Sequence, residues 1–170
     1  TVSPQALQAM MEKATKAGIT YKKGQRFSEY VTQMNELLKA EIPEGHELAF
    51  EKKFNKLTGE EVNLPYIVEA TPKIQGDDLA DARVQYNPQD NVPYVSMDFK
   101  TQGAKRFEEA TGANIGRRMA VILDGNVYSA PVIQAKIGGG HAQITMGGGR
   151  NANQIMTEAK DLALVLRAGA

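Results

Sequence analysis

The chain has 170 residues, of which 42% are hydrophobic and 24% charged, and its 20 basic and 20 acidic residues cancel. This is the composition of a globular protein, with room for one ordinary domain or two small ones. The lack of a basic excess argues against nucleic-acid binding and against a basic membrane-surface patch. Cysteine is absent, which excludes disulfides, thiol catalysis and thiolate zinc sites. Apolar runs stop at about five residues, whereas a membrane span needs about 18.

The first forty residues predict two helices. Ser3 can cap the first helix, Pro4 suits its first turn, and Gly18 can end it. The second helix is expected from Phe27 to Ala40, where apolar residues recur at helical spacing. These residues are Phe27, Tyr30, Val31, Met34, Leu37 and Leu38.

A β-hairpin is predicted next. Leu48 and Phe50 alternate with polar residues, and "LTGEE" is typical of a turn. A second alternating run then places five apolar residues on one strand face: Val62, Leu64, Tyr66, Val68 and Ala70. Pro65 lacks the N–H that an inner strand needs, so it favours an edge position for this strand.

The second half of the chain has a denser pattern of strands and helices. Alternating apolar residues predict strands near 82–86, 95–99 and 142–146. Helical spacing predicts a helix over 101–111 and a last helix over 151–167. Most connections between the strands are short, which favours antiparallel pairing.

Between these elements lies "MAVILDGNVYSAPVIQAKI". The apolar run 119–123 predicts a central strand that is buried on both faces. Asp124-Gly125 is a strong signal for a tight turn, and residues 127–134 are expected to return beside the first strand. Pro131 should end or bulge that returning strand.

Hairpins dominate this order of elements, so the sequence predicts an α+β fold in which an antiparallel β-sheet packs with helices. The stretch 71–78 is the best candidate boundary because it contains Pro72 and Gly76. We therefore expect two parts. Residues 1–75 form a helical and hairpin segment that leads into the second part, residues 76–170.

No catalytic constellation stands out. The loop Gly147–Asn151 precedes a helix, whose N-terminus could cradle a phosphate. It matches neither a Walker loop nor a dinucleotide fingerprint, so a flexible connection is the alternative. His46 and His141 lack metal-ligand spacing, and no serine lies in GxSxG. We expect no catalytic residue, no metal and no cofactor.

Methionines mark the first two helices. Met10, Met11 and Met34, with the aromatic Phe27 and Tyr30, could make a face that accepts varied apolar partners. Such a face would suit a protein that meets unfolded chains. The alternative is that these side chains pack in a core, as apolar helical stripes usually do.

Five stretches of the second half resemble the SecD/SecF protein-export family. They are "DFKTQGAKRFEEAT", "AVILDG", "SAPVI", "GGHAQITMGG" and "EAKDLALVLRAGA". Gly76, Leu79 and Ala82 match as well. The resemblance covers about residues 75–170 and implies the head of the first periplasmic domain of SecD. The pieces "HELAF" and "GEEVNLPYIVEATP" resemble the approach to that head.

The resemblance implies a bacterial inner-membrane protein with this fragment on the periplasmic side. Its partners would be an unfolded preprotein, SecF and the Sec channel, with no nucleic acid. The methionine and aromatic face then becomes the candidate preprotein contact, and Gly76 the candidate hinge of a moving head. The drive would be the proton-motive force, worth about 2.3 kcal/mol per charge per 100 mV.

Two rival functions remain open. The first is a small phosphate- or nucleotide-binding enzyme that uses the loop Gly147–Asn151. The second is a purely structural spacer.

Overall fold

The chain divides into two units in the computed structural model, which describes residues 2–55, 57–123, 125–146 and 151–168. Unit 1 comprises Thr1–Thr71 and Ile122–Val127, and unit 2 comprises Pro72–Val121 and Tyr128–Ala170. The chain therefore crosses between the units after residues 71, 121 and 127. The first of these crossings lies inside the stretch 71–78.

Both predicted helices of unit 1 are present. Helix α1 (Pro4–Lys16) begins where the hydroxyl of Ser3 accepts a hydrogen bond from the N–H of Ala6 at 3.1 Å. Helix α2 (Phe27–Leu37) ends earlier than the predicted Ala40. Each helix contributes an apolar stripe to one buried cluster, as the 3.6-residue period requires.

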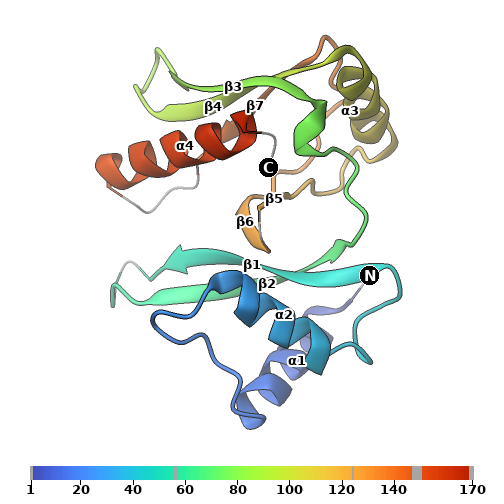
Figure 1. Ribbon diagram of the computed structural model, residues 1–170, viewed down its shortest axis with the longest axis vertical. Helices are drawn as coiled ribbons and strands as arrows, with labels where there is room; N and C mark the ends of the chain where they lie inside the picture. The colour runs from blue at the N-terminus through green and yellow to red at the C-terminus, as the bar shows by residue number, and fades with distance from the viewer. Residues whose placement is uncertain (1, 56, 124, 147–150, 169–170) are drawn as a thin grey trace. The chain divides into compact units, whose positions relative to one another are not determined.

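The hairpin of unit 1 supplies the other half of that cluster. Strands β1 (His46–Phe54) and β2 (Glu61–Glu69) pair antiparallel. Leu48 and Phe50 of β1 are fully buried in one cluster with residues of the two helices. Helices α1 and α2 lie on one side of the β1–β2 hairpin (Figure 1). The sheet has the order β2-β1-β6-β5, so the prediction that Pro65 marks an edge strand is confirmed.

The predicted central strand at 119–123 is wrong. Strand β5 (Val121–Leu123) has three residues, all half-buried, and lies at the end of the strand order opposite β2. Strand β6 (Asn126–Ser129) follows it and pairs parallel to β1 at Phe50. Strand β6 stops before Pro131, as predicted. An apolar run of five residues does not distinguish a central strand from a short one whose two faces are each partly covered.

Unit 2 is built on a three-stranded antiparallel sheet with the order β3-β4-β7. Strand β3 (Leu79–Tyr86) follows a single 3₁₀ turn, η1 (Gly76–Asp78). Strand β4 (Pro93–Phe99) lies between β3 and β7 (His141–Thr145). The alternation predicted from the sequence gives this sheet one apolar and one polar face.

Two helices complete unit 2. Helix α4 (Ala152–Arg167) lies along β3 and β4 (Figure 1), and Ala159 and Leu162 are fully buried there. Helix α3 (Thr101–Ala113) stacks Phe107 on Phe99 with ring centroids 4.6 Å apart. The α+β prediction, with antiparallel sheets packed with helices, is confirmed. No helix within the described ranges is long and apolar enough to cross a membrane.

The close approach of the turn at Gly125 to Val31 of α2 can be tested by mutation. Gly125 has φ +75°, and a Cβ there would lie 2.7 Å from Val31 Cγ1, whereas Gly18 has φ +77° with nothing within 4 Å. Gly18→Ala should cost only left-handed strain, about 1–2 kcal/mol. Gly125→Ala should cost about 1–3 kcal/mol more, through overpacking. Urea unfolding measures both free energies, and equal losses would contradict the close approach.

Candidate functional site

The five candidate preprotein-contact residues lie in or against the core of unit 1. Met10, Tyr30 and Met34 are buried, and Met11 and Phe27 are partly buried against them. The Tyr30 ring lies 5.3 Å from that of Phe50, and burial raises the pKa of the Tyr30 hydroxyl. Core packing, the alternative stated from the sequence, therefore describes these side chains in this structure. A preprotein contact through them stays a prediction that requires unit 1 to open.

The candidate hinge, Gly76, begins a turn that is fixed to helix α3. Gln75 donates its backbone N–H to the Asp78 carboxylate at 2.9 Å, and the side chain of Gln75 caps the same turn. The carbonyl of Asp78 accepts the N–H of Lys100 at 2.8 Å, immediately before α3. Asp78 thus holds both its own turn and the start of the next helix.

Asp78 is a buried carboxylate whose charge is compensated. Its side chain is 6% exposed and forms an ion pair with the guanidinium of Arg106. Burial raises the pKa of Asp78, but the hydrogen bonds from Gln75 and Arg106 outweigh it, so that the pKa lies below its usual value. The charged form of Asp78 therefore stabilises the folded state.

Gly103 allows helix α3 to approach this turn. A Cβ at Gly103 would lie 2.7 Å from Asp78 Cβ and would also collide with the Asp78 carbonyl oxygen. Two of the stretches that carry the family resemblance, around 76–79 and 98–107, are thus in direct contact. The buried carboxylate of Asp78 pairs with Arg106, and Gly103, which has no side chain, lets α3 lie close to the turn. Nothing in the sequence indicated this role for Asp78, because no local signal marks its long-range partner Arg106.

A polar cluster crosses the open face of the unit 2 sheet. Asp98 on the central strand accepts from Arg83 on β3 at 2.5 Å, and its other oxygen lies 2.5 Å from Nδ1 of His141 on β7. The hydrogen bonds with His141 and Arg83 lower the pKa of Asp98. The same carboxylate raises the pKa of Arg83. The cluster ties both edge strands to β4, and it includes His141, for which the sequence indicated no site.

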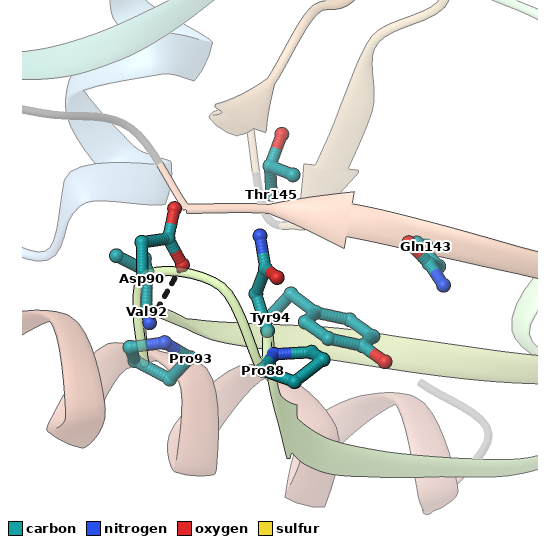
Figure 2. A pocket seen from close by; sticks show the side chains of 8 residues that line it. Pro88, Asp90, Val92, Pro93, Tyr94, Gln143 and Thr145 are labelled. Carbon is teal, nitrogen blue, oxygen red and sulfur yellow. Dashed lines mark hydrogen bonds between the residues drawn. The ribbon is translucent and has the colours of Figure 1, made fainter.

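The same face carries a shallow depression of about 300 Å³ at the end of the β3–β4 hairpin (Figure 2). The connecting loop forms one wall, where Asp90 accepts the backbone N–H of Val92 at 3.0 Å. Tyr94 from β4 and Gln143 and Thr145 from β7 complete the lining. Its polar groups are hydroxyls, amides and a loop carboxylate, which can hydrogen-bond a ligand.

The loop proposed for phosphate binding is the last candidate from the sequence. In the loop Gly147–Asn151, residues 147–150 lie outside the described residues. Asn151 caps α4 by accepting the N–H of Gln154 at 2.9 Å, and the Gln154 side chain accepts the N–H of Asn151 in return. Over the residues that the structure describes, no group of three or more His, Cys, Asp or Glu side chains could hold a metal ion.

Comparison with known families gives a match over most of the chain. A family model described as "SecDF, P1 head subdomain" matches residues 50–170. The match begins within β1 and so includes most of the hairpin of unit 1 as well as the whole of unit 2.

Named relatives agree with this match. Protein translocase subunit SecD of Calditerrivibrio nitroreducens is 46% identical over 129 residues, which are 75% of this chain and 24% of the relative. Protein translocase subunit SecDF of Thermus thermophilus is 48% identical over 98 residues, covering 58% of this chain and 12% of the relative. The chain spans about a quarter of the length of the SecD relatives.

Solved structures extend the likeness to residues 1–49. A structure described as that of a membrane component SecDF that enhances protein export has a TM-score of 0.52 and 27% identity, and the match covers 98% of this chain and 86% of that one. A crystal structure of SecDF in a super-membrane-facing form also has a TM-score of 0.52, with 46% identity over 60% of this chain and 13% of that one. Both units of this chain therefore have a counterpart in a solved SecDF structure.

The pH dependence of stability tests the role of Asp78. Its folded pKa lies below its unfolded value of about 3.9, so its stabilising effect is present above that value and is lost as pH falls through the folded pKa. Asp78→Asn should lower the unfolding free energy near pH 7 by about 1–3 kcal/mol. The difference in unfolding free energy between Asp78→Asn and the wild-type protein should disappear as pH falls below about 4.

Urea unfolding between pH 3 and pH 7 measures this difference. Asp77→Asn removes the neighbouring exposed carboxylate and serves as the matched control, with little expected effect. If the difference in unfolding free energy between Asp78→Asn and the wild-type protein does not change with pH, the stabilising role of the ionised Asp78 carboxylate is contradicted.

Proposed function

The chain belongs to the SecD/SecDF family of protein translocase subunits, in the P1 head subdomain, and from this we propose that it is a non-catalytic module that holds an unfolded preprotein during export. The match of residues 50–170 to the P1 head carries the proposal. We propose the rest of the assignment with it: a bacterial inner-membrane protein, this module on the periplasmic side, and SecF and the Sec channel as partners.

The side-chain chemistry of the described residues supports a binding role. The polar face of the unit 2 sheet offers hydroxyl, amide, carboxylate, guanidinium and imidazole groups, and Asp98 joins the guanidinium of Arg83 to the imidazole of His141. These groups suit reversible contacts with a chain of any sequence. Binding of this kind should be weak, because ordering a flexible ligand costs conformational entropy.

Mechanical coupling would supply the energy for movement. A module outside the bilayer lies outside most of the transmembrane field, which acts on charges within the membrane. In this proposal, motion reaches the module through its covalent connection to membrane helices of the whole protein. The module then holds the preprotein and swings with it.

The hinge of this motion is proposed at residues 71–76. The chain passes from unit 1 to unit 2 after Thr71, and Gly76 is the first residue of the turn that Asp78 fixes. Gly76 therefore forms the head-side limit of the flexible segment. Two more crossings, after residues 121 and 127, must bend as well for the units to move.

Binding to an unfolded polypeptide tests the proposed function. Reduced, carboxymethylated α-lactalbumin stays unfolded, and native α-lactalbumin is the folded control. The chain should bind the unfolded form with micromolar or weaker affinity and ignore the native form, as measured by fluorescence anisotropy. Equal negligible signals would support a spacer, and a melting temperature raised by nucleotide or phosphate would support the enzyme alternative.

Backbone order parameters test the hinge. The amides of Lys73 and Ile74 should give lower NMR order parameters than that of Leu79, whose N–H donates to the carbonyl of Gly76. The amide of Lys100, held by Asp78, is a second rigid reference. Values for Lys73 and Ile74 as high as for these two would contradict a hinge in this segment.

A further inference from the structure

The two edges of the unit 2 sheet differ in how their backbone groups are used. In an antiparallel pair, alternate residues turn their N–H and C=O groups toward the partner strand or away from it. The N–H of Phe99 donates to the carbonyl of Gly140 at 2.8 Å, which fixes the phase of the β4–β7 ladder. Ala142 and Ile144 therefore bond to β4. The peptide groups of the residues between them point away from β4.

The outward peptide groups of β7 belong to His141, Gln143 and Thr145. All three residues are exposed, and β7 ends the strand order of its sheet in the described chain. Each presents one N–H and one C=O, so that this edge offers about six hydrogen-bonding groups at strand spacing. Another extended backbone matches such a row, which is why an uncovered strand edge can pair with an added strand.

The outer edge of β3 is covered at Ala82, in the middle of the strand. The same alternation turns Ala82 outward, and its N–H donates to the Asp81 carboxylate at 2.9 Å. Its carbonyl accepts from Arg167 Nη2 at 2.8 Å, and Arg167 Nε also contacts Asp81 at 3.2 Å. The last turn of α4 thus protects β3, as natural proteins protect strand edges. No comparable side-chain hydrogen bond covers the β7 edge among the described residues.

The surroundings of β7 suit an added strand. The side chains of Gln143 and Thr145 line the depression on the polar face (Figure 2), next to the ring of Tyr94. On the other face Ile144 is buried. A strand laid along β7 would place alternate side chains toward the depression, whose lining includes the carboxylate of Asp90, and toward the apolar face.

We propose that the outer edge of β7, at His141, Gln143 and Thr145, binds an extended polypeptide by β-strand addition. The inference rests on the proposed function and names its recognition site. Main-chain hydrogen bonds explain how one module accepts chains of unrelated sequence. A folded protein is rejected because most of its backbone groups are already paired.

A proline at position 143 tests the site without touching the β4 ladder. The N–H of Gln143 faces outward, and proline is tolerated where a strand N–H faces solvent. Gln143→Pro should weaken binding of carboxymethylated α-lactalbumin about fivefold to tenfold, the loss of one hydrogen bond with local distortion. Gln143→Ala removes the side chain but keeps the N–H, so it should weaken binding less than Gln143→Pro does. Circular dichroism and melting temperature check that both variants are folded.

A second measurement leaves the protein unchanged. A ten-residue unstructured peptide rich in Val and Thr should bind the wild-type chain, and the same peptide with alternate amides N-methylated should bind at least about fivefold more weakly. This result supports main-chain recognition even if Gln143→Pro does not fold.

The outcomes separate the two proposals. Binding by the wild-type chain that Gln143→Pro and N-methylation leave unchanged overturns the β7 site and keeps the proposed function. No binding of any unfolded probe overturns both. A dimer of the chain in sedimentation that Gln143→Pro abolishes, with polypeptide binding unchanged, shows that a second copy occupies this edge and also overturns the inference.

Discussion

The backbone N–H of Phe50 donates to the carbonyl of Gly125 at 2.9 Å, and unit 1 depends on this hydrogen bond between distant parts of the chain. The Phe50 side chain is fully buried under α1 and α2, while its main chain pairs with β2 on one side and β6 on the other. Because Ile122–Val127 belongs to unit 1, neither unit is one continuous segment. Any motion of the head must therefore bend three crossings, which restricts it far more than a single linker would.

The hydrogen bonds and ion pairs within unit 2 keep the proposed binding edge ordered. Asp78 fixes the entry turn to α3, and Asp98 ties β3 and β7 to the central strand. A binding edge must stay ordered without a ligand, since each residue ordered on binding costs about 1–2 kcal/mol of backbone entropy. The same edge must stay weak enough to release the chain, and three outward-facing residues give a short contact. The exported chain is thus expected to bind weakly, through main-chain hydrogen bonds, to a sheet that is already ordered.

Local signals in the sequence predicted most elements, and long-range pairing explains the errors. Ser3, Pro4 and Asn151 mark helix starts through bonds to near neighbours, so these starts were confirmed. The run 119–123 was placed in the centre of a sheet because apolar periodicity carries no information about strand order. Likewise Asp78 and His141 gain their roles from Arg106 and Asp98, 28 and 43 positions away. The spacing of the methionines on the first two helices does not distinguish a buried core from a surface that binds an unfolded chain. In the structure these side chains pack in or against the core of unit 1.

The central claim is that this module grips an exported chain at a sheet edge and performs no chemistry on it. The most direct test is photo-crosslinking in a full-length SecD relative whose P1 head region is replaced by this chain, with a preprotein arrested during export. A photoreactive residue at position 143 should form adducts with the preprotein, and one at position 85, on the far strand of the same sheet, should form few or none. Equal adducts at both positions, or none at either, would contradict the account.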